Sequence, residues 1–251
     1  HLELRPLSDL VQGYTSTGPT GSLTCKLYVD YVYLDTDERR RFAQVSHEYL
    51  IEQVQFTGTE TVNTNTTNKN VTLNFNHPVK ELVWAHTTSN HSSAFTTSTD
   101  ASGNWFNYSG SDVSGCDSFT TALLQLNGHD RFSVRYADYF RKVQCYEHHQ
   151  RVPRVGGDMG LKSDTRQGSL RQYIYCYSFA LSPEEHQPSG TCNFSRIDNA
   201  VLQLNYAADS QLGTGALQTQ LTRTALNLNI YAVNYNVLRI MSGMGGLAYS
   251  N

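Results

Sequence analysis

The chain has 251 residues and a formal net charge of −3. This length allows one large domain or two small ones, and the charge disfavours a dedicated nucleic-acid-binding protein, because such proteins are basic. No run approaches the roughly 18 apolar residues that a membrane-spanning helix needs. Ser, Thr and Asn make up about a quarter of the chain, and they favour turns and strands over helix interiors. The composition therefore predicts a turn-rich, all-β protein.

The first part of the chain, residues 1–20, is predicted to hold a short strand from Leu2 to Leu7 and a linker that contains Gly and Pro. The chain begins with His1 rather than Met, and no signal-peptide pattern follows. We therefore expect it to be a piece of a longer protein or a processed product. The remaining residues, 21–251, are expected to form one domain.

Strands are predicted along most of this domain, because apolar and polar residues alternate with the period of two that a half-buried strand requires. The alternation is strict in Val71–Asn76 and in Ala200–Asn205. About eight strands are expected, and eight antiparallel strands in two packed sheets form a jelly roll. This number is drawn from nine candidate ranges, which are 22–34, 48–58, 71–76, 80–86, 122–127, 173–179, 200–205, 226–230 and 234–241.

Two short helices are predicted between the strands. Residues 35–44 begin with Asp35, which can cap the helix, and Glu38 lies three residues later, as in a capping box. The arginines that follow, 39–41, fit a solvated helix face or a surface that meets a neighbouring subunit. A second helix is expected over 135–142, where apolar residues recur at helical spacing: Tyr136, Tyr139, Phe140 and Val143.

Two long stretches, 87–117 and 146–170, lack strand character and are predicted to be surface loops, the first facing outward. The predicted core consists of the inward faces of three strands. Its members are Leu73, Phe75, Leu202, Leu204, Leu226, Leu228 and Ile230.

No catalytic, cofactor or metal site is predicted. The histidines show no HxH or HExxH spacing, and His148 and His149 would point to opposite faces of a strand. The run Gly243–Gly246 is interpreted as a tight turn, because no helix can follow it. The cysteines are odd in number, lie far apart and form no CxxC pair, so they are predicted to be buried free thiols in a reducing compartment. They are Cys25, Cys116, Cys145, Cys176 and Cys192.

Asn-x-Ser/Thr sequences offer candidate glycosylation sites wherever they fall in or beside loops. The candidates are Asn65, Asn70, Asn90 and Asn107. A fifth such sequence begins at Asn193, which is expected to have a structural role because it starts a predicted strand.

Several long motifs occur in order from about residue 25 to the end of the chain. They are Tyr31–Gln44, His47–Gln53, Phe75–Pro78, Leu126–Phe132, Pro188–Ala200 and Asn234–Tyr249. Together they resemble the major capsid proteins of nucleocytoplasmic large DNA viruses, and the algal-virus type most of all.

The resemblance implies a structural, non-enzymatic protein without a cofactor. Such proteins carry two consecutive jelly rolls and form pseudo-hexagonal homotrimers. The trimers tile an icosahedral shell over an internal membrane, which the protein does not enter. The implied partners are further copies of the subunit, neighbouring capsomers, and minor capsid and penton proteins, with no direct contact to nucleic acid. The implied location is the virion, assembled in the infected host cell. On this basis, residues 1–20 correspond to the last strand of a first jelly roll and a linker, and 21–251 to the second jelly roll.

Two alternatives share the predicted architecture. A carbohydrate-binding jelly roll could stack sugars on Trp105, Phe106 and Tyr108, although these aromatics equally suit pinning down their own loop. A cupin-like metalloenzyme is disfavoured by the missing histidine spacing. Glycan binding would favour the first alternative and stoichiometric metal the second.

Overall fold

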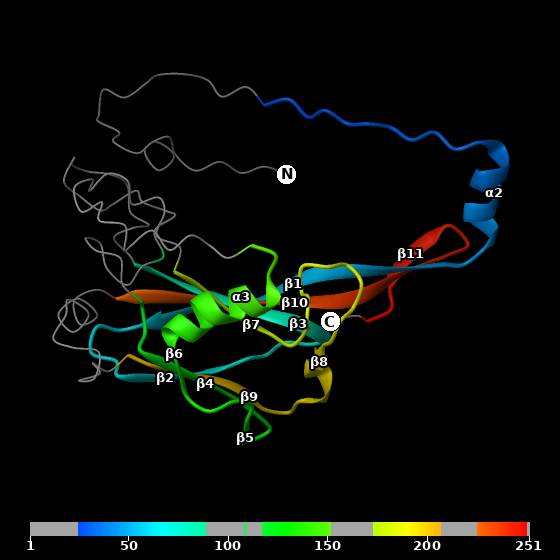
Figure 1. Cartoon of the computed structure of the whole chain (residues 1–251). Coiled ribbons are helices and arrows are strands. Elements are labelled where there is room, and N and C mark those ends of the chain that lie inside the picture. The colour runs from blue at the N-terminus through cyan, green and yellow to red at the C-terminus, as the bar shows by residue number, and fades with distance from the viewer. Residues whose placement is uncertain (1–24, 89–107, 109–116, 152–172, 207–224, 250–251) are drawn as a thin grey trace, which may run out of the picture.

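The computed structural model describes residues 25–88, 108, 117–151, 173–206 and 225–249. Two antiparallel β-sheets pack face to face (Figure 1). The first contains β1 (His47–Val62), β10 (Leu226–Met241), β3 (Pro78–Thr88) and β7 (Ile174–Ser178), with β11 (Met244–Leu247) on β10 and β8 (Cys192–Asn193) on β3. The second contains β2 (Asn68–Thr72), β9 (Ala200–Asn205), β4 (Thr121–Leu126), β5 (His129–Asp130) and β6 (Arg135–Tyr136). The helices are α2 (Thr36–Gln44), the π-helix η1 (Tyr139–Val143), α3 (Gln144–His148) and the 3₁₀-helix η3 (Phe194–Arg196).

The strands pair in a nested order, in which early strands pair with late strands within each of the two sheets. Along the chain, β1 pairs with β10, β2 with β9, β3 with β7, and β4 with β5. This nesting confirms the predicted all-β jelly-roll class. The described residues form eleven strands rather than the eight expected, since β6, β8 and β11 pair beside the main order of the two sheets.

The core lies between the two sheets, and every predicted core residue is at most 4% exposed. Large aromatic side chains fill its centre. Phe119 packs against Tyr175 with ring centroids 4.5 Å apart, and Trp84 contacts Phe140 at 5.2 Å. The prediction of the core from strand alternation is confirmed, because one face of each strand turns inward.

Two predicted strands are missing or shortened in the structure. Within 22–34, the described residues 25–34 form no strand, because they pair with no other strand. The strand predicted over 71–76 ends at Thr72; beyond it the side chain of Gln55, not a neighbouring strand, bonds both the N–H and the C=O of Asn76.

The two strands predicted over 226–230 and 234–241 are one continuous strand, β10. Its pairing with β3 shifts register between Val233 and Asn234, where the alternation in the sequence is interrupted. Asn234 is fully buried there, and its side-chain amide donates to the carbonyl of Tyr235. A polar residue that satisfies a backbone group thus interrupts the pattern without ending the strand.

The first predicted helix is confirmed as α2. Asp35 accepts from the N–H of Glu38 at 2.8 Å, and the Glu38 carboxylate accepts from the N–H of Asp35, so the capping box is complete. The second helix is displaced from its predicted range, 135–142. Arg135, in β6, pairs with Ala122 of β4, so the start of the predicted helix is a strand instead. The helices that follow are η1 and α3.

The predicted tight turn over Gly243–Gly246 is confirmed at Gly243 alone, because Met244–Gly246 belong to the strand β11. Ser242 and Gly243 have φ angles of 52° and 76° and join β10 to β11 in a two-residue hairpin, where positive φ matches the twist of the strands. Several predicted features lie outside the described residues: most of the loops 87–117 and 146–170, the first part of the chain, 1–20, and Cys116. No described helix is long and apolar enough to cross a membrane.

Candidate assembly surface and buried clusters

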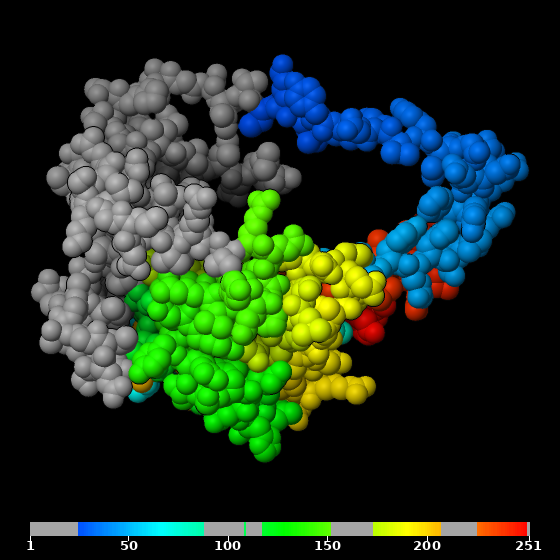
Figure 2. Space-filling model, viewed as in Figure 1, coloured from blue at the N-terminus to red at the C-terminus, as the bar shows by residue number. Residues whose placement is uncertain are grey.

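An exposed arm, residues 25–46, precedes the sandwich. Residues 25–35 have no regular structure, α2 follows, and all residues of the arm are exposed. Figures 1 and 2 show this arm, in blue, leading away from the sandwich. Its apolar side chains are large, and Leu27, Tyr28 and Tyr33 are each 87–89% exposed. Because no other described residue covers this run of apolar side chains, the arm is a candidate surface for another protein.

The α2 helix, which is the last part of the arm, contacts the start of β1 through aromatic rings. The ring of Phe42 lies 4.8 Å from that of His47, which stacks on Tyr49. α2 buries none of its residues, so its arginines, 39–41, are exposed to solvent. Arg40 and Asp37 form an ion pair at 3.8 Å that is too exposed to contribute much stability.

A second exposed apolar patch lies on the outer face of β1 and β10, opposite the core. Val54, Phe56 and Tyr231 form it, with exposures of 66%, 47% and 36%. Phe56 and Tyr231 are directly paired across the strands and stack at 4.8 Å. We call the arm and this patch together the candidate assembly surface.

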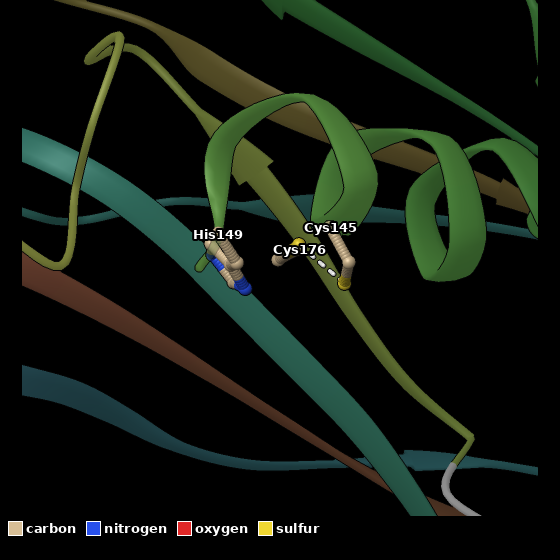
Figure 3. Close-up of side chains that lie close together, drawn as sticks. All are labelled: Cys145, His149 and Cys176. Carbon is tan, nitrogen blue, oxygen red and sulfur yellow. Dashed lines mark hydrogen bonds between the residues drawn. The ribbon is translucent and has the colours of Figure 1, made fainter. Parts of the chain in front are cut away.

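A thiol–imidazole cluster lies where α3 packs on the outer side of β7 (Figure 3). Cys145 and His149 stand one turn apart at the end of α3, and Cys176 comes from β7. The two sulfur atoms are 3.5 Å apart. Nε2 of His149 lies 2.5 Å from Oε1 of Glu81 on β3. Both thiols are at most 4% exposed, whereas the side chain of His149 is 17% exposed, so the sulfur atoms are buried and the imidazole reaches the surface.

The electrostatics of the cluster favour a thiolate beside an imidazolium. The hydrogen bond from Cys176 lowers the pKa of Cys145 to about 5, with help from His149 and against the effect of burial. Hydrogen bonds with Cys145 and Glu81 raise the pKa of His149 to about 10. The hydrogen bond to the Cys145 thiolate, followed by burial, raises the pKa of Cys176.

This cluster is not among the features predicted from the sequence, because His148 and His149 are treated there as strand residues. They end α3 instead, and His148 turns away to the carbonyl of Leu181. The Cys145-x-x-x-His149 spacing, which places both side chains on one face of a helix, was the available signal. Cys192, half-buried, and Cys25, exposed, are free thiols outside the cluster; the prediction of buried thiols is therefore wrong for Cys25.

A buried polar network ties the residues before β4 to β7 and η1. His86 bonds Ser118 at 2.7 Å and Tyr206 at 2.8 Å. Arg141 donates to both carboxylate oxygens of Asp117, at 2.9 and 3.0 Å, and also contacts Asp138. Burial lowers the pKa of His86 to about 3, so its ring is neutral. The network pairs most of its buried polar groups, although one terminal nitrogen of Arg141, Nη1, has no hydrogen-bond partner. No motif in the sequence predicted this network.

The candidate glycosylation residues fall in two places. Asn65 lies in the turn before β2 and Asn70 lies on β2, and both are exposed. Asn90 and Asn107 lie outside the described residues. Asn193 accepts from the N–H of Ser195 and caps η3, in keeping with its predicted structural role.

Of the aromatics considered for sugar stacking, Tyr108 is described, and it packs against the core cluster. Trp105 and Phe106 lie outside the described residues.

Comparisons with known proteins agree with the motifs. A sequence model of the family described as large eukaryotic DNA virus major capsid protein matches residues 38–160 and 165–246. The major capsid protein of Pyramimonas orientalis virus is 48% identical over 232 residues, which cover 90% of this chain and 48% of that protein. The major capsid protein of Paramecium bursaria Chlorella virus 1 is 43% identical over 280 residues, covering 98% of this chain and 59% of that protein.

Solved structures agree as well. A quasi-atomic model of the Paramecium bursaria Chlorella virus 1 capsid matches with a TM-score of 0.62 and 41% identity, covering 88% of this chain and 56% of that chain. The Faustovirus major capsid protein, at 14% identity and a TM-score of 0.50, is similar in fold alone. The chain spans about half the length of the curated relatives it matches. These matches give the carbohydrate-binding alternative no support.

Proposed function

This chain belongs to the family of large eukaryotic DNA virus major capsid proteins, and we propose that it is a structural jelly roll of an icosahedral capsid subunit. The role is architectural, since the sandwich serves as a rigid block and its exposed surfaces bind neighbouring blocks. The proposed location is therefore the virion shell, assembled in the infected cell, with other capsid proteins as partners.

The observation that carries this proposal is the candidate assembly surface. The arm presents apolar side chains such as Tyr33 that no part of the described chain covers, and the β1–β10 patch presents Phe56 and Tyr231. Burying such residues in an interface supplies the apolar contact that stable subunit interfaces require. Because the family consists of major capsid proteins, we assign this interface to contacts between capsid subunits.

We propose further that the complete subunit contains two jelly rolls and forms a closed homotrimer. The chain covers 48–59% of the relatives' length, which leaves room for a second domain of similar size. In this arrangement 1–20 is the end of a first jelly roll with its linker, and 21–251 is the second. Cyclic symmetry then closes three subunits into a finite capsomer.

Sedimentation velocity of the complete subunit and of this chain tests the proposal. We expect the complete subunit to sediment as a trimer and this chain to be monomeric or aggregated, because half of the lateral contacts are missing. A monomeric complete subunit at micromolar concentration would contradict the capsomer. A stable trimer of this chain would instead show that the second jelly roll is sufficient.

The same proposal assigns the exposed Asn65 and Asn70 to a surface that sugar can reach. Intact glycopeptide mass spectrometry of protein from the natural source tests this assignment. Unmodified peptides at both positions would remove it.

A further inference from the structure

The thiol–imidazole cluster has the composition of a metal site. One ligand atom each from Cys145, His149 and Cys176 lie within 4.8 Å of one another. They come from two elements, α3 and β7, that are 31 residues apart at the cysteines. Figure 3 shows the three side chains converging between the helix and the strand. Sulfur and imidazole nitrogen are the ligands that zinc prefers in structural sites.

The spacing of the atoms fits zinc. Zinc binds thiolate sulfur at about 2.3 Å, so two sulfurs on a tetrahedral ion stand about 3.8 Å apart. The observed separation is 3.5 Å. A disulfide instead requires about 2.05 Å between the sulfurs, and it would leave His149 beside an uncharged bridge. The cluster is therefore closer to a zinc site than to a disulfide.

Glu81 supports the same interpretation. Its carboxylate contacts Nε2 of His149 and also interacts with the thiol of Cys176. Metal-binding histidines are held in place by such carboxylates. Glu81 is only 7% exposed, and a divalent cation among two thiolates and a carboxylate would offset negative charge that is costly to bury.

Burial argues against a catalytic cysteine. A nucleophilic thiol needs a partly exposed position that a substrate can reach, whereas Cys145 and Cys176 are 4% and 3% exposed. Buried cysteine ligands suit a structural ion.

We propose that Cys145, Cys176 and His149 bind one zinc ion, and that Glu81 orients the His149 ring through its hydrogen bond, outside the coordination sphere. The ion would link α3 to β7, on the outer side of the first sheet. It would thereby fix the helix that covers this edge of the sheet, which β3 separates from the uncovered β1–β10 patch.

The first test uses the wild-type chain, produced in zinc-supplemented medium and purified under reducing conditions without chelator. We expect elemental analysis to find one zinc per chain. Replacement by Co²⁺ should give the visible absorption bands of a tetrahedral thiolate site. A folded, reduced protein without zinc after this preparation would overturn the proposal. Peptide mapping that finds a Cys145–Cys176 disulfide in freshly alkylated protein would overturn it as well.

Variants identify the ligands. We expect Cys145→Ser, Cys176→Ser and His149→Gln each to abolish stoichiometric zinc, and Glu81→Gln to weaken zinc binding about 10- to 100-fold. Cys192→Ser is the matched control, because Cys192 is a free thiol outside the cluster, and it should retain full zinc. Retention of zinc by the Cys145 and Cys176 variants would assign the metal to other residues.

A chelator experiment keeps the test independent of variant folding. Zinc removal from the wild-type chain should lower its melting temperature, because a structural metal contributes to folding stability. Added zinc should restore the original value, and added Mg²⁺ should not. An unchanged melting temperature after complete zinc removal would contradict a structural role.

Discussion

The sandwich and the arm carry the same kinds of apolar residue in opposite environments. In the sandwich, Leu204 and Leu228 are at most 1% exposed, whereas in the arm Leu27 and Tyr28 are 87–89% exposed. The sandwich strands find partners within the chain, while residues 25–35 form no strand pairing. The sandwich is thus stabilised by its own contacts, whereas no other described residue covers the apolar side chains of the arm.

The comparison predicts that core truncation is the most damaging change. Leu204→Ala should lower the free energy of unfolding by about 2–5 kcal/mol, because it removes buried apolar contacts and leaves a cavity. Urea unfolding of the chain measures this change. The control, Val54→Ala, affects a side chain that is 66% exposed and should cost less than about 0.5 kcal/mol. Equal effects would mean that the two strand faces have been assigned wrongly.

Breaking the buried ion pair should have a slightly smaller effect. Asp117→Ala leaves Arg141, which is 5% exposed, without its bidentate partner. We expect a loss of about 3 kcal/mol in urea unfolding. Asp37→Ala breaks the exposed pair with Arg40 in the arm and should change stability by at most about 0.5 kcal/mol. A similar cost for both would remove the distinction between the two regions.

The buried His86 predicts a stability loss in acid. Burial lowers its pKa in the folded protein to about 3 from the ordinary 6.5, so below pH 6.5 the unfolded chain takes up a proton that the folded chain does not. The contribution of His86 is complete above pH 6.5 and falls by about 1.4 kcal/mol per pH unit toward pH 3. Unfolding measured across this window should show a flatter pH dependence for His86→Gln. An unchanged slope would show that other groups cause the acid sensitivity.

The smallest effect on stability is expected in the arm, with the largest effect on assembly. The double variant Tyr31→Ala and Tyr33→Ala removes rings that are 74% and 89% exposed. Urea unfolding of this chain should change by less than about 0.5 kcal/mol, while the complete subunit should lose trimer in sedimentation velocity. A trimer of undiminished stability would exclude these rings from the assembly surface.

Local sequence signals determined much of this protein. The alternation in Ala200–Asn205 specified both a strand and its inward face, because the side-chain period of two is a property of the extended backbone. Asp35 and Glu38 specified the start of α2, because a capping box needs only residues three positions apart. The family motifs likewise lie in continuous segments, and they identified the fold and the family together.

Tertiary structure decided the features that depend on a distant partner. The apolar pattern of 25–34 could not show whether another strand would pair with it, and in the structure none does. The backbone after β2 bonds the distant side chain of Gln55. The residues before η1 pair with β4. The cluster of Cys145, His149 and Cys176 exists because α3 packs on β7, and no local periodicity encodes that contact. Spacing along a chain specifies which residues share a face, but only the packing of elements determines which faces meet.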